Sequence, residues 1–141
     1  MHGGVIKIYL AASWSRREEI AKVADALREL GVEVTSRWLL PPANRPKTGL
    51  AKFHRQRAME DVEDVKASEI LVRFTDDLSA TMVPAKLATG SRMFEMGLAW
   101  AMGKPIIVVG GHQPIFDHLV NITHLKTTGE LLRYLSPTEI N

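Results

Sequence analysis

The chain has 141 residues, of which 45% are hydrophobic, so we expect a single domain over residues 1–141 and exclude two separate catalytic domains. Its 18 Lys and Arg residues nearly balance its 16 Asp and Glu residues, which disfavours a nucleic-acid polymer as a partner, because such binders carry a dense basic surface. The absence of cysteine excludes disulfides, thiolate nucleophiles and cysteine-based zinc sites, and it favours a cytoplasmic location.

The first 36 residues have the pattern of a β-α-β unit. Residues 5–10 are apolar and rich in β-branched side chains, which predicts a strand buried on both faces. Ser13 and Ser15 offer capping oxygens for a helix whose apolar residues recur at helical spacing as far as Gly31. Residues 32–36 then predict a second strand.

The rest of the chain alternates between predicted helices and strands. We expect helices at 50–67, 92–102 and 128–135, and strands at 70–74, 106–109 and 122–125. Residues 41–49 contain three prolines and a glycine and predict a loop, and residues 75–90 form a second long connection. This alternation predicts a doubly wound, flavodoxin-like or Rossmann-like parallel sheet of about five strands, with ligands at the carboxyl edge near the switch in strand order.

Several common site motifs are missing from the sequence. The turn after the first strand, residues 11–16, lacks the glycines of a dinucleotide-binding turn, and the sequence contains neither a P-loop nor a serine-hydrolase elbow. The five histidines lack metal-ligand spacing, so we expect no metal and no cofactor. No apolar run approaches the roughly 20 residues of a membrane helix, and residues 1–4 do not resemble a signal peptide, so we expect no membrane association.

Glu95 is the most informative polar residue in the sequence. It falls near the start of a predicted helix that is otherwise apolar, where a carboxylate is costly unless it is hydrogen-bonded or used in chemistry. The alternative is that Glu95 has only a structural role, as an acid near the N-terminus of the helix whose charge interacts favourably with the helix dipole. The predicted fold brings Tyr9 and Asp61 to the same region, because Tyr9 lies near the end of the first strand and Asp61 lies on the helix before the third strand.

Four segments carry a resemblance to a known family. They are Ile8-Tyr9-Leu10-Ala11-Ala12, Asp61 followed by Ala67-Ser68-Glu69-Ile70-Leu71-Val72, Gly90-Ser91-Arg92-Met93-Phe94-Glu95-Met96-Gly97-Leu98-Ala99, and Gly103-Lys104-Pro105-Ile106. Over about residues 5–110 the chain resembles the nucleoside 2-deoxyribosyltransferase family, which includes the 2'-deoxynucleoside 5'-phosphate N-hydrolases. The run from Phe94 to Ala99 before Gly103 is the most specific part of this resemblance.

The resemblance implies an enzyme that cleaves the N-glycosidic bond of a (deoxy)nucleoside or its 5'-monophosphate. Glu95 would be the nucleophile that forms a covalent glycosyl-enzyme, and the sugar would pass to water or to another base. Tyr9 would orient the nucleophile, and Asp61 would contact the leaving base, where a proton donor improves the leaving group. The structural alternatives stay open: Tyr9 as a buried strand aromatic, and Asp61 as part of a solvated acidic helix face.

The resemblance also implies where the substrate binds. Ser13 and Arg16 lie in the turn where family members that act on nucleotides hold a 5'-phosphate, and a hydroxyl, a guanidinium and a helix N-terminus suit an anion. Thr89 stands six positions before the nucleophile, where family members acting on free nucleosides carry an acid, and this favours a monophosphate substrate. The expected substrate-contacting residues are Ala11, Ala12, Ser13, Trp14, Arg16, Gly90, Ser91, Asp117 and His118.

Family members complete their sites with a neighbouring subunit, through the loop after the fourth strand. That loop is 112–118 in this chain, so the resemblance implies a homo-oligomer, a dimer or larger, with shared active sites. A non-catalytic nucleotide-binding module of the same fold is the alternative function, and an interaction domain that uses the basic segment 45–57 is a third. The preferred base, the sugar and the choice between hydrolysis and base exchange stay open.

Overall fold

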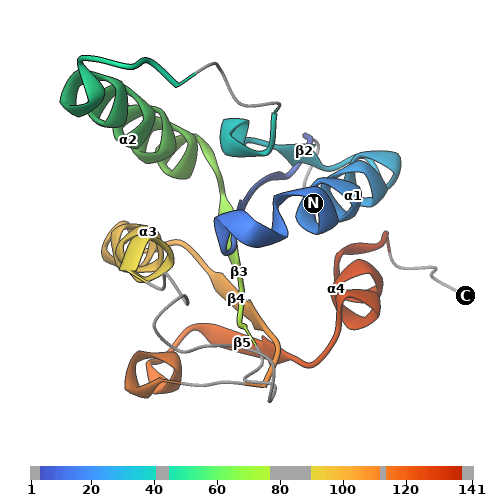
Figure 1. The fold of residues 1–141 in the computed structure, drawn as a ribbon. Helices are drawn as coiled ribbons and strands as arrows, with labels where there is room; N and C mark the ends of the chain where they lie inside the picture. Colours follow the sequence, from blue (N-terminus) through green and yellow to red (C-terminus); the bar gives the residue numbers. More distant parts are fainter. Residues whose placement is uncertain (1–3, 41–44, 77–89, 112–113, 138–141) are drawn as a thin grey trace, which may run out of the picture.

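The computed structural model describes residues 4–40, 45–76, 90–111 and 114–137 as one α/β domain with a single parallel sheet (Figure 1). The strands are β1 (Lys7–Ala11), β2 (Glu33–Val34), β3 (Ile70–Phe74), β4 (Ile106–Val109) and β5 (Ile122–Leu125). Their order in the sheet is β2-β1-β3-β4-β5, and every neighbouring pair is parallel. The predicted five-stranded doubly wound sheet is therefore confirmed.

Helices cover both faces of this sheet. They are α1 (Arg17–Glu29), α2 (Leu50–Ala67), α3 (Gly90–Ala101) and α4 (Thr128–Leu135), with short 3-10 turns η1 (Trp14–Arg16), η2 (Arg37–Leu39) and η4 (Ile115–His118). In Figure 1, α1 and α4 lie on one side of the strands, and α2 and α3 lie on the other. No helix in the described part of the chain is long and apolar enough to cross a membrane.

The alternation of side chains along β1 places Tyr9 toward α2 and α3. Ile8 and Leu10 belong to the core cluster on the side of α1 and α4, whereas Tyr9 and Ala11 belong to the cluster that includes Val65 of α2 and residues of α3. Successive side chains of a strand point to opposite faces, so the position of Tyr9 in β1 fixes the face on which its hydroxyl lies.

The strand order reverses between β1 and β3. The chain leaves β1 for α1 on one face, and after β3 its next described helix, α3, lies on the opposite face. In open parallel sheets, a crevice for ligands forms outside the carboxyl ends of the strands at such a switch point. The turn after β1 and the start of α3 are the segments beside this point, as the sequence predicts.

Four elements have boundaries other than those predicted: the strand expected at 5–10 covers Lys7–Ala11, the helix expected at 92–102 covers Gly90–Ala101, and the first helix and the second strand also differ. The first helix begins at Arg17, because the turn η1 precedes it and satisfies backbone groups through a bond from the Arg16 N–H to the Ser13 carbonyl. Neither serine caps it: the hydroxyls of Ser13 and Ser15 lie 2.9 Å from each other. The second strand covers only Glu33–Val34, because it is an edge strand that pairs with β1 alone. Of the predicted loops 41–49 and 75–90, residues 41–44 and 77–89 lie outside the described residues.

Candidate active site

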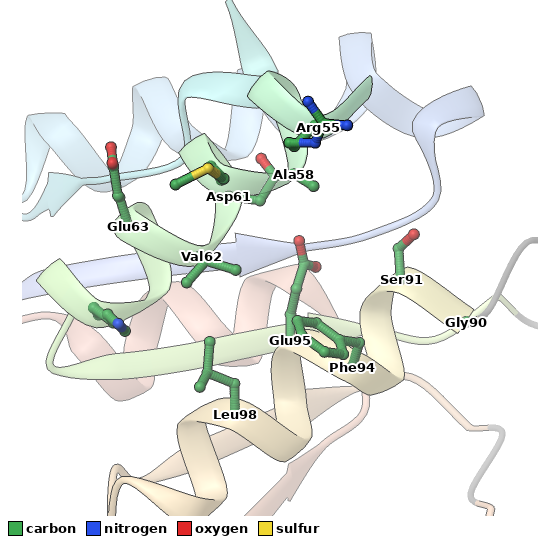
Figure 2. A pocket seen from close by; sticks show the side chains of 12 residues that line it. Arg55, Ala58, Asp61, Val62, Glu63, Gly90, Ser91, Phe94, Glu95 and Leu98 are labelled. Atoms are coloured by element: carbon green, nitrogen blue, oxygen red, sulfur yellow. The ribbon is translucent and has the colours of Figure 1, made fainter. Parts of the chain in front are cut away.

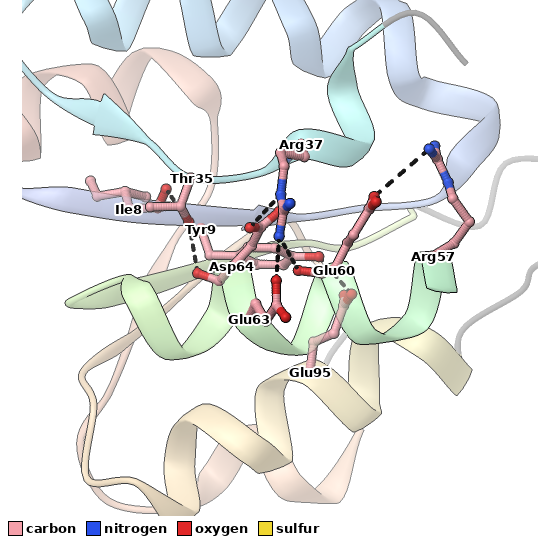
Figure 3. A network of polar contacts seen from close by, with 9 residues as sticks. All are labelled: Ile8, Tyr9, Thr35, Arg37, Arg57, Glu60, Glu63, Asp64 and Glu95. Atoms are coloured by element: carbon pink, nitrogen blue, oxygen red, sulfur yellow. Dashed lines mark hydrogen bonds and ion pairs between the residues drawn. The ribbon is translucent and has the colours of Figure 1, made fainter. Parts of the chain in front are cut away.

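Tyr9 and Glu95 form a buried pair at the centre of the candidate site. The Tyr9 hydroxyl on β1 donates a 2.6 Å hydrogen bond to Oε2 of Glu95 on α3 (Figure 3). Tyr9 is fully buried and Glu95 is 8% exposed. Burial raises the pKa of Glu95 to about 7, against the effect of the hydrogen bond from Tyr9. Burial also raises the pKa of Tyr9 well above its usual value, so its hydroxyl remains a donor.

Glu95 faces a cavity of about 750 Å³ between α2 and α3 (Figure 2), which we call the Glu95 cavity. Its volume is in the range of small-molecule sites. Its lining residues are Arg55, Ala58, Met59, Asp61, Val62, Glu63, Lys66, Gly90, Ser91, Phe94, Glu95 and Leu98. The predicted residues Gly90 and Ser91 are thus beside Glu95, and Asp61 faces the same space from α2.

Asp61 is a second carboxyl group with a raised pKa. Burial raises the pKa of Asp61 to about 6, the nearby charge of Asp64 adds to this, and Arg57 opposes it. The charge of Asp61 in turn raises the pKa of Glu95. Two carboxyl groups whose pKa values both lie near neutrality can share the roles of proton donor and nucleophile.

Asp61 also lines a second cavity, of about 440 Å³, which we call the aromatic cavity. Its lining residues are Trp14, Trp38, Arg45, Phe53, His54, Arg57 and Asp61. Trp14 belongs to η1 and Phe53 to α2, so this cavity lies between the turn after β1 and the helix that carries Asp61. Sequence reasoning identified Trp14 but missed Trp38 and Phe53, which carried no spacing that would single them out.

The turn after β1 is folded around Arg16. Ser13 is buried and Ala12 half-buried, whereas Trp14 is 54% exposed. The Arg16 guanidinium donates to both carboxylate oxygens of Glu19, at 3.0 and 2.7 Å, and to the Thr75 carbonyl at 2.9 Å. Arg16, predicted to contact a substrate phosphate, is therefore already paired inside the protein.

A buried ion pair anchors the start of α3. Arg92 lies 2.9 Å from Asp76 and donates to the Phe74 carbonyl at 3.1 Å, and both charged side chains are almost fully buried. Arg16 lies 3.4 Å from the same Asp76 carboxylate. These contacts connect the turn after β1, the end of β3 and the helix that presents Glu95. Sequence reasoning missed Asp76 and Arg92, although a buried arginine three residues before Glu95 in an apolar helix is the same kind of signal.

Arg37 fixes the position of α2 through the carboxylates of Glu63 and Asp64 (Figure 3). Its backbone N–H and its Nε each donate at 2.9 Å to the Asp64 carboxylate, and its Nη2 donates at 2.9 Å to Glu63. Asp64 is 6% exposed, so the acidic run around Asp61 is only partly a solvated face. Asp61 and Asp64 lie three residues apart on α2, so the contacts of Arg37 hold the helix one turn from Asp61.

Asp117 and His118, which were predicted to complete the active site of a neighbouring subunit, lie in η4. The Asp117 side chain is fully buried and pairs with Arg73 at 2.5 Å, whereas His118 is exposed. Thr89 lies outside the described residues. Within the described ranges, no group of three or more metal-ligating side chains could hold an ion.

Comparisons with known proteins place this fold among solved structures. A scan of protein-family models gives no match, and neither does a search of curated proteins. The CMP N-glycosidase BcmB of Clostridium botulinum is 20% identical, with a TM-score of 0.56 over 92% of this chain and 97% of that one. A conserved protein from Enterococcus faecalis is 19% identical, with a TM-score of 0.66 over 92% of this chain and 96% of that one. These likenesses establish a shared fold.

Proposed function

We propose that this protein cleaves the N-glycosidic bond of a nucleoside or nucleoside monophosphate through a covalent glycosyl-Glu95 intermediate. The observation that carries the proposal is the 2.6 Å bond from the Tyr9 hydroxyl to Glu95, at the wall of a cavity that Asp61 also lines. The C. botulinum protein of the same fold is named as a CMP N-glycosidase, and this name supports the class of bond that is cleaved.

The chemistry follows from the positions of the three side chains. A carboxylate oxygen of Glu95 attacks the anomeric carbon of the sugar while the bond from that carbon to the base nitrogen breaks. The electron pair of this bond goes to the base, and the proton of Asp61 neutralises the base as it leaves. Water or the N–H of a second base then gives a proton to the Asp61 carboxylate and attacks the same carbon, which breaks the ester to Glu95 and releases the sugar product.

Tyr9 holds the nucleophile through this cycle. Its hydroxyl occupies one carboxylate oxygen of Glu95, so the other oxygen is the one available to attack the sugar. A hydrogen bond to a buried carboxylate also favours the ionised form, which is the form that reacts. Tyr9 therefore orients the attacking group and keeps it reactive.

A substrate panel tests the proposal. The purified protein is incubated with ribo- and deoxyribonucleosides and their 5'-monophosphates, with and without an acceptor base, and free base is followed by chromatography. We expect release of base by the wild-type protein and at least a thousandfold slower release by Glu95→Gln. Release without acceptor identifies a hydrolase, and product only with acceptor identifies a transferase. A folded wild-type protein that cleaves no panel member would overturn the proposal and favour a nucleotide-binding module.

The monophosphates in this panel also test the role predicted for Arg16. A 5'-phosphate in the turn after β1 has to compete with Glu19 for the guanidinium. If the substrate is a monophosphate, Arg16→Gln raises KM for it, while KM for the matching nucleoside changes little. Equal effects on both substrates contradict phosphate recognition by Arg16.

We also propose that two or more copies of the chain assemble through α3 and η4. An apolar groove there has a volume of about 640 Å³, and its lining residues are Met93, Met96, Gly97, Trp100, Pro114, Ile115, Phe116 and Leu119. Ile115 is 77% exposed and Phe116 is 53% exposed, and contiguous exposed apolar side chains mark interaction surfaces. Light scattering should give at least a dimer for the wild type and a monomer for Ile115→Asp, and a monomeric wild type contradicts the assembly.

The cytoplasmic location stays a prediction.

A further inference from the structure

Asp61 shares its helix with a second buried carboxyl group that competes for the same proton. Asp64 lies three residues further along α2, which places it about one turn away. Asp61 is half-buried and lines both cavities, whereas Asp64 is 6% exposed. Burial raises the pKa of each group, and the charge of Asp64 raises that of Asp61 further. The position of one proton between the two groups therefore decides which of them can act as an acid.

The two carboxyl groups differ in their hydrogen bonds (Figure 3). Oδ2 of Asp64 accepts from the Arg37 backbone N–H and Oδ1 accepts from the Arg37 Nε, both at 2.9 Å. Such bonds favour the ionised form of a carboxyl group, and they lower the pKa of Asp64 against the effect of burial. Asp61 forms no hydrogen bond and no ion pair with any residue in the described ranges. Of the two groups, only Asp64 is therefore held as a carboxylate by direct contacts.

Arg37 is itself fixed in place beside α2. Its Nη2 donates to the Glu63 carboxylate at 2.9 Å and to the Glu60 carbonyl at 3.3 Å. Two residues earlier, the Thr35 hydroxyl donates to the Asp64 carbonyl at 2.9 Å, and the Thr35 N–H bonds to a carbonyl of β1 at 2.9 Å. The contact between Arg37 and Asp64 is therefore set by the segment that follows β2 and by its attachment to the sheet.

Asp64 has the largest electrostatic effect among the charged groups around Asp61. Its charge raises the pKa of Asp61 more than that of Glu60 does, while Arg57 and Arg37 lower this pKa. The direct effect of Arg37 on Asp61 is smaller than the effect of Asp64 and opposite in sign. Arg37 thus acts on Asp61 mainly through Asp64, by keeping that group ionised.

The remaining ionisable groups near Asp61 come from other elements or from the cavity walls. Tyr9 on β1 and Glu95 on α3 face the cluster, and the charge of Asp61 raises the pKa of each. The other described charged or titratable side chains that line the two cavities are Arg45, His54, Arg55, Glu63 and Lys66. Substitution of Arg37 leaves all of these groups in place.

We propose that Arg37 is a positioning residue of this site: by holding Asp64 as a carboxylate, it leaves the proton of the two carboxyl groups on Asp61. The role in catalysis rests on the proposed function, in which the Asp61 proton neutralises the leaving base. Without the Arg37 side chain, Asp64 is a buried carboxylate with fewer donors, and it takes up the proton in place of Asp61. Asp61 then meets the leaving base in its ionised form and cannot act as its acid.

An NMR titration tests the placement of the proton without any turnover. The side-chain carboxyl carbons of Asp61 and Asp64 are followed across pH, and their signals are assigned with Asp61→Asn and Asp64→Asn. In the wild type we expect Asp61 to ionise at a higher pH than Asp64. In Arg37→Met we expect the midpoint of Asp64 to rise and that of Asp61 to fall. Unchanged midpoints, or a midpoint of Asp61 that rises as the loss of a nearby cation alone requires, would overturn the proposal.

The pH dependence of cleavage tests the consequence for catalysis. Near pH 6.5 we expect Arg37→Met to lower kcat/KM for a nucleoside about tenfold, because a hydrogen bond from a charged donor contributes about that factor. Below about pH 5 Asp61 is protonated in both proteins, so the two rates should converge. A (deoxy)riboside with a nitrophenolate leaving group needs no acid, and its cleavage should change by less than about twofold. Equal losses on both substrates at every pH would show that Arg37 has only a structural role.

Three further experiments isolate the contact. Arg37→Lys keeps a cation beside Asp64 and should retain most of the wild-type rate. Asp64→Asn removes the competing group, so adding Arg37→Met to it should cause no further loss. Arg28→Met is the matched control, because Arg28 pairs with Asp25 at 3.2 Å on α1 and lines neither cavity. Circular dichroism establishes that each variant is folded, and losses from Arg37→Met and Asp64→Asn that simply add contradict the proposal.

The two readouts separate this proposal from the proposed function. Cleavage of a nucleoside by the wild type, together with carboxyl midpoints that do not change in Arg37→Met, refutes the role of Arg37 and leaves the role of Glu95 intact. Midpoints that shift as expected, with no cleavage of any nucleoside by the wild type, support the placement of the proton and refute the catalytic role.

Discussion

The Tyr9 hydroxyl and the Glu95 carboxylate are 86 residues apart in the sequence and 2.6 Å apart in the structure. β1 supplies the donor and α3 supplies the acceptor, and the two meet only because β1 and α3 pack on the same side of the sheet. A carboxylate that is buried in this way loses its hydration, and a single phenol hydroxyl replaces part of it.

Tyr9→Phe should therefore make Glu95 harder to ionise. The hydrogen bond lowers the pKa of Glu95, so its removal raises that pKa, by about one unit for a bond to a charged group. We expect kcat/KM near pH 6.5 to fall at least about tenfold and the alkaline limb of the pH profile to move upward. Tyr134→Phe, at an exposed tyrosine of α4, is the control. If Tyr9→Phe is slower but the two limbs of its pH profile stay at the wild-type pH values, this role of Tyr9 is contradicted.

The two carboxyl groups predict a narrow, bell-shaped pH profile for kcat/KM. Cleavage needs Glu95 ionised and Asp61 protonated, but the pKa of Glu95 is about 7 and that of Asp61 is about 6. Among protein molecules in which the two carboxyl groups hold one proton between them, about one tenth then have it on Asp61 with Glu95 ionised. We expect kcat/KM to fall below pH 6, where both groups are protonated, and above pH 7, where neither is. A rate that climbs steadily to pH 9 is incompatible with this assignment.

Asp61→Asn should be rescued by a better leaving group. The variant has no proton to give, so we expect slow cleavage of ordinary nucleosides at every pH. A (deoxy)riboside with a nitrophenolate leaving group needs no proton, and we expect the variant to cleave it at close to the wild-type rate. Its rate should rise with ionisation of Glu95 and stay level at high pH. Equal losses on both substrates show that Asp61 is not the proton donor.

The strands β3 and β4 could be predicted to the residue, whereas the prediction for β1 was shifted from Lys7–Ala11 to 5–10. β3 and β4 are buried on both faces, so β4 is a continuous apolar run at 106–109 and β3 is an apolar run at 70–74 that only Arg73 interrupts. The edge strand β2 has one neighbour, and there the same reasoning predicted five residues where two pair. The start of α1 was also misjudged, because a serine before a helix signals a cap only if no other partner takes its hydroxyl.

The site was predictable where one residue contrasts with its surroundings. Glu95 is a carboxylate in an apolar helix, and this contrast is visible in the sequence. The pairing of Arg92 with Asp76 and of Arg37 with Asp64 is set by how elements pack across the sheet, which local patterns do not encode. Pairings of this kind became visible only with the structure.

Glu95→Gln should stabilise the fold more at high pH than at low pH. The pKa of Glu95 rises from 4.5 to about 7 on folding, so the folded state binds its proton more tightly than the unfolded state does. The wild type thus loses stability as pH rises from 4.5 through 7, by at most about 3 kcal/mol. Glutamine does not ionise and avoids this loss, while its oxygen still accepts the Tyr9 hydroxyl. Denaturant unfolding at pH 5 and pH 8 measures the difference, and Glu18→Gln on exposed α1 is the control. A gain of the same size at both pH values would refute ionisation of buried Glu95 as the cause.

Gly110→Ala should destabilise the end of β4. Gly110 has a φ of +127°, and a Cβ there would lie 1.8 Å from Oγ1 of Thr75. Neither residue can move freely, because the Gly110 N–H bonds to the Leu125 carbonyl at 2.9 Å and the Thr75 N–H bonds to the Val109 carbonyl at 2.8 Å. We expect a loss of about 2 kcal/mol or more in the free energy of unfolding.

A matched glycine separates this clash from a general effect of adding a methyl group. Gly129 lies in the first turn of α4, and a Cβ there meets only ordinary van der Waals contacts at 3.7 Å and beyond, so Gly129→Ala should stabilise by about 0.5–1 kcal/mol through helix propensity. Because the Thr75 carbonyl also holds Arg16, Gly110→Ala should disturb the turn after β1 and weaken substrate binding as well. Unfolding midpoints that coincide for Gly110→Ala and the wild type would show that β3 and β4 can separate at this point without cost.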